Sequence, residues 1–111
     1  MKGAHLGEFE ELVLLTVAIL NGEAYGFTIT EEIEKNTGRS ISMRAVHTAL
    51  YRLEEKGLAK SNLGGATSQR GGRRKRIYSI SQSGKNALAD MKNVRNKMWD
   101  LIPKTVISNA K

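Results

Sequence analysis

The chain has 111 residues and carries 18 Lys and Arg against 11 Asp and Glu, for a formal net charge of +7. This length is enough for one domain with a modest core. The chain contains no Cys, which excludes disulfides and thiolate metal sites and fits a reducing compartment. The longest apolar run, residues 12–20, is too short to span a membrane, and acidic residues precede it where a signal peptide is basic. We therefore expect a cytoplasmic protein.

The positive charge is concentrated in the middle of the chain. Residues 39–76 hold ten basic and two acidic side chains, whereas residues 1–38 hold two basic and seven acidic ones. Residues 77–111 hold six basic and two acidic side chains. A cationic block inside a folded chain indicates a polyanionic partner. The alternative is a solvated surface that only aids solubility.

Two helices are predicted in the first third of the chain, because apolar residues recur at steps of three and four over residues 8–21 and 25–36. The stripe of the first helix is wide, which predicts burial on more than one side. It comprises Phe9, Leu12, Val13, Leu15, Thr16, Ile19 and Leu20. The second helix presents Tyr25, Ile29 and Ile33 on its inner face.

The third helix has the clearest boundaries. Ser42 is a suitable N-cap, and Gly57 fits the left-handed position after the helix, with Leu58 contacting Leu53 in a Schellman motif. Val46, Ala49, Leu50 and Leu53 form the predicted inner face. The outer face carries Arg44, His47, Thr48, Tyr51, Arg52 and Glu55. All but Glu55 donate hydrogen bonds, which suits contacts with phosphates and base edges; the alternative is an ordinary solvated face.

A basic hairpin follows the third helix. Residues 58–63 and 77–80 favour extended backbone and predict two strands. Four glycines lie in residues 64–72 between them, and Arg70, Arg73, Arg74, Lys75 and Arg76 lie on the return side. Hairpins of this kind bind phosphates or enter a minor groove. We predict DNA contacts from Arg70, Arg73, Arg74 and Lys75. Three helices and a hairpin predict a winged helix-turn-helix, a mainly α fold with a small β-hairpin.

The last predicted helix begins after Ser81 as N-cap and ends or kinks at Pro103. Its apolar stripe has little of the domain left to cover it, so we expect it to pair with a second copy of the chain. The predicted dimerisation residues are Leu88, Met91, Val94, Met98, Leu101 and Ile102. The alternative is packing against the first helix. We thus expect a DNA-binding part over residues 1–80 and a dimerisation helix and tail over residues 81–111.

No catalytic or metal site is predicted. Ser83-Gly84-Lys85 lacks the flanking residues of a phosphate loop, and His5 and His47 have no carboxylate cluster beside them. No nucleophile and base form a recognisable arrangement. We therefore expect neither an enzyme nor a cofactor.

Three segments in order resemble the PadR family of bacterial transcriptional regulators. Ala24-Tyr25-Gly26 resembles the family's A-Y-G, and Leu50-x-Arg52-Leu53-Glu54-x-x-Gly57-Leu58 resembles its L-x-R-L-E-x-x-G-L. Gly71-Gly72-Arg73, Lys75 and Tyr78, followed by Ile80-Ser81-x-x-Gly84, resemble its glycine-rich hairpin. The resemblance covers about residues 9–88 and implies a winged-helix homodimer that represses transcription. The single helix after Gly84 is similar to the smaller branch of the family and implies that this helix is the dimer arm.

The third helix departs from the family pattern, because His47 stands where a tyrosine is common and Thr48 where a proline is common. Operator preference therefore does not carry over. Some small members of the family bind flat ligands on a tryptophan of the last helix, and Trp99 is similar in position; its alternative role is to anchor the dimer core. Two other functions stay open, a winged-helix adaptor for an acidic protein and a basic RNA-binding domain.

Overall fold

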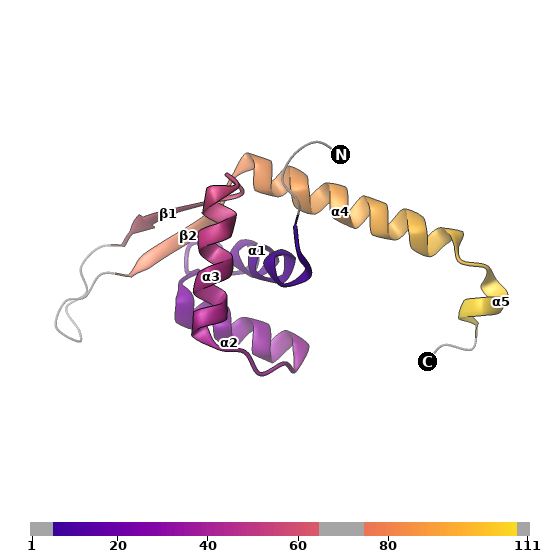
Figure 1. Ribbon diagram of the computed structural model, residues 1–111, viewed down its shortest axis with the longest axis horizontal. Helices are drawn as coiled ribbons and strands as arrows, with labels where there is room; N and C mark the ends of the chain where they lie inside the picture. The colour runs from indigo at the N-terminus through magenta and orange to yellow at the C-terminus, as the bar shows by residue number, and fades with distance from the viewer. Residues whose placement is uncertain (1–5, 65–74, 109–111) are drawn as a thin grey trace.

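The computed structural model describes residues 6–64 and 75–108. Three helices and a two-stranded hairpin form a compact head, and a long helix extends away from it (Figure 1). The elements in chain order are α1 (Glu8–Leu20), α2 (Gly26–Thr37), α3 (Met43–Glu55), β1 (Ala59–Leu63), β2 (Arg76–Ile80), α4 (Gln82–Leu101) and α5 (Lys104–Ile107). The predicted fold class, mainly α with a small hairpin, is confirmed.

Both ends of α3 form as the sequence predicts. The Ser42 hydroxyl accepts a hydrogen bond from the Ala45 N–H at 3.1 Å. Gly57 has φ +75°, in the left-handed region, and its N–H donates to the Glu54 carbonyl at 3.0 Å. The Leu58 N–H donates to the Leu53 carbonyl at 2.9 Å, which completes the Schellman motif and turns the chain into β1.

The core lies where α1, α2 and α3 meet. Its largest fully buried side chains are Leu14, Ile29, Ile33, Leu50, Leu53, Val13, Val17 and Val46. Each such side chain stabilises the fold by about 1.5–3 kcal/mol relative to exposure. The predicted burial of α1 on more than one side is confirmed by its contacts with α2, α3, β2 and α4, although two residues of its stripe, Leu15 and Ile19, are 40% and 58% exposed. The side of α1 away from α2 and α3 is only partly covered by α4.

The hairpin is antiparallel and is tied to the chain between α1 and α2. Ala59 pairs with Ile80 and Leu63 with Arg76. The Tyr78 N–H donates to the Ala24 carbonyl at 2.8 Å, so β2 is held on its other side by the residue before the N-cap of α2. Both predicted strands are confirmed, with β1 beginning one residue later and β2 one residue earlier than expected.

Helix α4 starts against the hairpin and then leaves the head (Figure 1). The Ser81 hydroxyl accepts from the Gly84 N–H at 3.0 Å and donates to the Gly57 carbonyl at 2.7 Å, so this predicted N-cap also joins α4 to the end of α3. The helix ends at Leu101, two residues before Pro103, as predicted. The one-turn α5 was not predicted. Within the described ranges, no helix is both long and apolar enough to cross a lipid bilayer.

We expect Gly84→Ala to destabilise the fold. Gly84 is buried, and a methyl group there would collide with the Leu58 carbonyl oxygen and the Ile80 side chain. Because the obstacle includes backbone, the free energy of unfolding should fall by about 1–3 kcal/mol. Urea unfolding at a fixed protein concentration measures it. The exposed neighbour provides the control: Ser83→Ala should change stability by less than about 0.5 kcal/mol. Equal stability of the two variants would contradict the close approach of α4.

Candidate nucleic-acid interface

Five side chains form one exposed face of α3. Arg44, His47, Thr48, Tyr51 and Arg52 are all exposed, and Tyr51 retains 64% of its accessible surface. Their spacing of three, one, three and one residues places them on the same side of a helix. Among residues 6–64 and 75–108, no hydrogen bond or ion pair occupies these five side chains. The face therefore presents free donors and two guanidinium groups to the solvent.

The start of α2 lies beside this face. The His47 ring packs so close to Gly26 that an added Cβ there would come within 2.9 Å of two ring atoms. Gly26 is the first residue of α2, so the imidazole rests on the N-terminal end of that helix. His47 is thus exposed on one side and packed against Gly26 on the other.

The base of the hairpin contacts the same end of α2. The Lys75 Nζ lies 4.2 Å from the centre of the Tyr25 ring and donates a hydrogen bond to the Tyr25 hydroxyl at 3.1 Å. A cation–π contact at a half-exposed site stabilises by about 0.5–1 kcal/mol. Tyr25 was expected on the inner face of α2, but it is the N-cap residue and is only half-buried. The contact joins residues fifty positions apart, and no sequence pattern signalled it.

The other hairpin cations fall into two groups. Arg70, Arg73 and Arg74, which the sequence predicts as DNA contacts, lie outside the described residues. Arg76 is described, and its guanidinium donates to the Ser61 hydroxyl at 3.0 Å. Burial of the Tyr78 hydroxyl on the same strand raises its pKa, with repulsion from Glu54 adding to the shift and the Arg76 charge opposing it.

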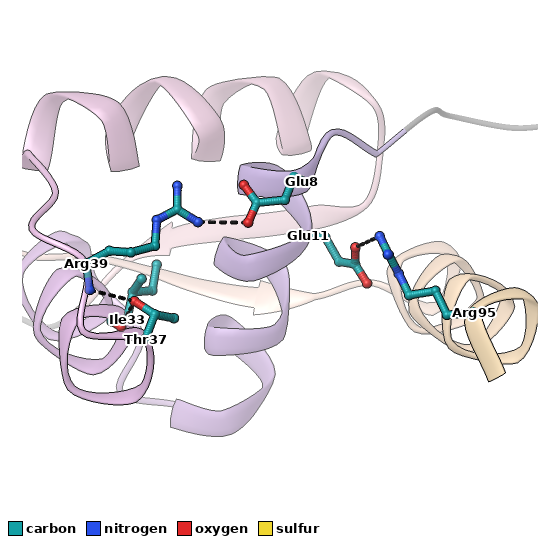
Figure 2. A network of polar contacts seen from close by, with 6 residues as sticks. All are labelled: Glu8, Glu11, Ile33, Thr37, Arg39 and Arg95. Carbon is teal, nitrogen blue, oxygen red and sulfur yellow. Dashed lines mark hydrogen bonds and ion pairs between the residues drawn. The ribbon is translucent and has the colours of Figure 1, made fainter. Parts of the chain in front are cut away.

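The first turn of α1 neutralises cations from three other elements. Glu8 pairs with Arg39 of the α2–α3 connection at 2.7 Å, and Glu11 pairs with Arg95 of α4 at 2.8 Å (Figure 2). Glu10 pairs with Lys56, the C-cap of α3, at 2.6 Å. Carboxylates at a helix N-terminus are also favoured by the helix dipole. Arg44 and Arg52, the two basic residues within α3, take no part in these ion pairs.

The predicted dimerisation residues divide along α4. Leu88 and Met91 are half-buried and pack against the core of the head. Val94, Met98 and Leu101 are 50%, 63% and 71% exposed. Ile102 is half-buried at the end of the helix. The distal part of α4 thus carries an uncovered apolar stripe.

A groove of about 400 Å³ runs between α1 and α4. Its walls include Leu15, Leu88, Arg95 and Trp99. Trp99 is 61% exposed, so its ring borders the groove without filling it.

Comparison with known proteins gives one family. The family model described as the transcriptional regulator PadR-like family matches residues 14–90. No curated protein matches the sequence.

Several solved structures share the fold. A PadR-like transcriptional regulator from Bacillus cereus strain ATCC 14579 is 21% identical, with a TM-score of 0.67 over 91% of this chain and 88% of that one. A PadR family transcriptional regulator from Eggerthella lenta DSM 2243 is 22% identical, with a TM-score of 0.67 over 92% of this chain and 88% of that one. Bacillus subtilis PadR in complex with operator DNA is 21% identical, with a TM-score of 0.63 over 76% of this chain. The present chain covers 46% of the length of that PadR.

Proposed function

The chain belongs to the PadR-like family of transcriptional regulators, and we propose that it binds double-stranded DNA as a homodimer and represses transcription. The observation that carries this proposal is the exposed donor face of α3, flanked by the start of α2 and the base of a basic hairpin. Binding of operator DNA by the similar Bacillus subtilis PadR supports it. A dimer that occupies two half-sites would block access of polymerase to the promoter.

We assign α3 to the major groove. An α-helix fits that groove, and Arg44, His47, Thr48, Tyr51 and Arg52 offer hydrogen-bond donors at positions where side chains meet base edges. His47 also packs on the start of α2, so the two helices would dock on the duplex as one unit. We therefore expect α3 to determine sequence preference.

We assign the hairpin to the DNA backbone or the minor groove. Lys75 is fixed against Tyr25 at the start of α2, which directs the base of the hairpin toward the side on which α3 is exposed. In the sequence, Arg70, Arg73 and Arg74 come shortly before Lys75. Cations on such a loop contribute mainly sequence-independent phosphate contacts.

We assign the distal half of α4 to the dimer interface. Val94, Met98 and Leu101 are exposed in the single chain, and a second copy of the same stripe is their natural cover. Two-fold symmetry would then place two α3 helices on two half-sites of one operator.

Trp99 supports a second role, the binding of a flat aromatic effector. Its half-exposed ring borders the groove between α1 and α4, and an aromatic ligand would stack on it. If Trp99 instead anchors the dimer core, its fluorescence emission should shift to shorter wavelength on dimerisation, because the ring leaves water, and should be unaffected by aromatic cations or anions. Titration of planar dyes against Trp99 fluorescence separates the two roles.

Selection from a random duplex library tests the proposed function directly. Enriched palindromic sites would support a DNA-binding dimer. Enrichment of no duplex, together with capture of an acidic protein partner, would favour the adaptor. Preference for single-stranded RNA would favour the RNA-binding alternative.

Binding to duplex DNA should weaken steeply with salt. If the dimer neutralises about six to eight phosphates, the log–log slope of the binding constant against salt should be about −5 to −7. Fluorescence anisotropy at several salt concentrations measures this slope. A slope near zero would contradict binding to the phosphates of the DNA backbone.

Replacing Met98 and Leu101 together with Glu should split the dimer, because two carboxylates would enter an apolar seam. We expect the dimer dissociation constant to rise by about thirtyfold or more. Sedimentation equilibrium measures it, and Asn93→Glu, at an exposed position of the same helix away from the stripe, is the control. An unchanged dimer in the double variant would refute the assignment of the arm.

Helix and hairpin variants should differ in kind. Arg44→Ala or Tyr51→Ala should cost about 1–3 kcal/mol on the preferred site and relax its sequence, if the residue contacts a base. Arg73→Ala with Arg74→Ala should weaken all duplexes alike and flatten the salt slope by about one to two units. Titrations against selected and scrambled duplexes at two salt concentrations distinguish these effects. Loss of selectivity in the hairpin variant alone would reverse the two roles.

A further inference from the structure

We propose that the Glu11–Arg95 ion pair fixes the angle between the head and α4, and that this angle selects the spacing of the two half-sites. The inference rests on the proposed function, since spacing has meaning only for a dimer on DNA. Glu11 and Arg95 are positioning residues in this role, because neither belongs to the predicted DNA-contacting set.

Helix α4 is held to the head at two separated places. At its first turn, Gly84 lies directly against the Leu58 carbonyl. Eleven residues further on, about 16 Å along the axis, Arg95 Nη2 lies 2.8 Å from Glu11 Oε1. Leu88 and Met91 pack on the core between these two points. Past Arg95, the side chains of Met98 and Leu101 are mostly exposed.

Glu11 is a firm reference point for the second tether. Its helix continues directly into Val13 and Leu14, which are completely buried. Its side chain is only 15% exposed, whereas the side chain of Arg95 is 54% exposed. The carboxylate is thus fixed by the head, and the guanidinium reaches it from α4 (Figure 2). An ion pair shielded on one side is screened less by salt than a fully exposed one.

A small tilt of α4 at the Glu11–Arg95 pair displaces the heads by a distance comparable to the rise of one base pair. A tilt of about 6° about Gly84 moves the helix axis at Arg95 by about 1.7 Å, so equal tilts in two protomers together amount to about 3.4 Å, the rise of one base pair. In a symmetric dimer the same tilt occurs in both protomers, so the two heads are displaced in equal and opposite senses. Inserting one base pair also rotates one half-site by about 34° relative to the other. Changing the distance between the two half-sites therefore tests the angle between α4 and the head.

The experiment uses the operator obtained by duplex selection with the wild-type chain. Three duplexes are compared: the selected operator, one with a base pair inserted at its centre and one with a base pair deleted there. The discrimination ratio is the affinity for the selected spacing divided by that for each altered spacing. In Glu11→Gln and in Arg95→Met we expect this ratio to fall by about three- to fivefold. The double variant should fall no further than either single variant, and Arg95→Lys should retain most of the discrimination.

Glu8→Gln is the matched control. It removes a carboxylate from the same turn of α1, but its partner Arg39 belongs to the α2–α3 connection and not to α4. Its discrimination ratio should equal that of the wild type. A purely structural ion pair would lower the unfolding midpoint of Glu11→Gln and leave the ratio unchanged, and that result would overturn the proposal.

A second measurement needs no DNA. Because the chain has no Cys, Lys35→Cys on the exposed side of α2 gives one spin label per protomer. Double electron–electron resonance between the two labels should show a broader distribution of distances in Glu11→Gln than in the otherwise wild-type chain or in Glu8→Gln. An unchanged distribution with unchanged discrimination would refute the positioning role. A wild-type chain that selects no palindromic duplex would instead refute the proposed function, and this inference with it.

Discussion

The burial of α1 is the constraint on which the rest of the structure depends. Val13, Leu14 and Val17 are almost completely removed from solvent, and α1 contacts α2, α3, β2 and α4. A single helix thus holds the two helices of the helix-turn-helix, the return strand of the hairpin and the arm. Each of the parts assigned to DNA or to the dimer is positioned through it, so their relative geometry depends on one well-packed element.

Helix α1 also determines which cations are ion-paired and which face the solvent. The first turn of α1 supplies three carboxylates, each paired with a cation from a different element. Arg39, Lys56 and Arg95 are therefore ion-paired, whereas Arg44 and Arg52 of α3 have no such partner among the described residues and face the solvent. The strongly basic middle of the sequence overstates the charge that is free for a polyanion. Because some of these cations are already ion-paired, phosphate contacts are better assigned to particular unpaired side chains than inferred from the net charge of the segment.

How far the sequence predicts the structure depends on the range of the interaction. The Ser42 cap and the Gly57–Leu58 Schellman motif involve neighbouring residues, so residue type and spacing were sufficient to locate both ends of α3. The Lys75–Tyr25 and Glu11–Arg95 contacts join residues 50 and 84 positions apart. Such pairs depend on how finished elements pack, and hydrophobic periodicity carries no information about them. The same limit applies to α1: its wide stripe predicted burial on more than one side, but not that Leu15 and Ile19 would stay exposed.

The groove beside Trp99 connects the proposed effector site to the proposed spacing device. Glu11 and Arg95 line the same groove as Trp99, so a ligand stacked on the ring would lie next to the ion pair. A charged ligand would compete with one partner of the pair and favour a different angle of α4. By linkage, a ligand that prefers one angle must bind DNA-bound and free protein with different affinity, and DNA must change the affinity for the ligand by the same factor. The size of that factor is limited by the difference in ligand affinity between the two angles, so a neutral ligand that leaves the ion pair intact would bind without releasing DNA.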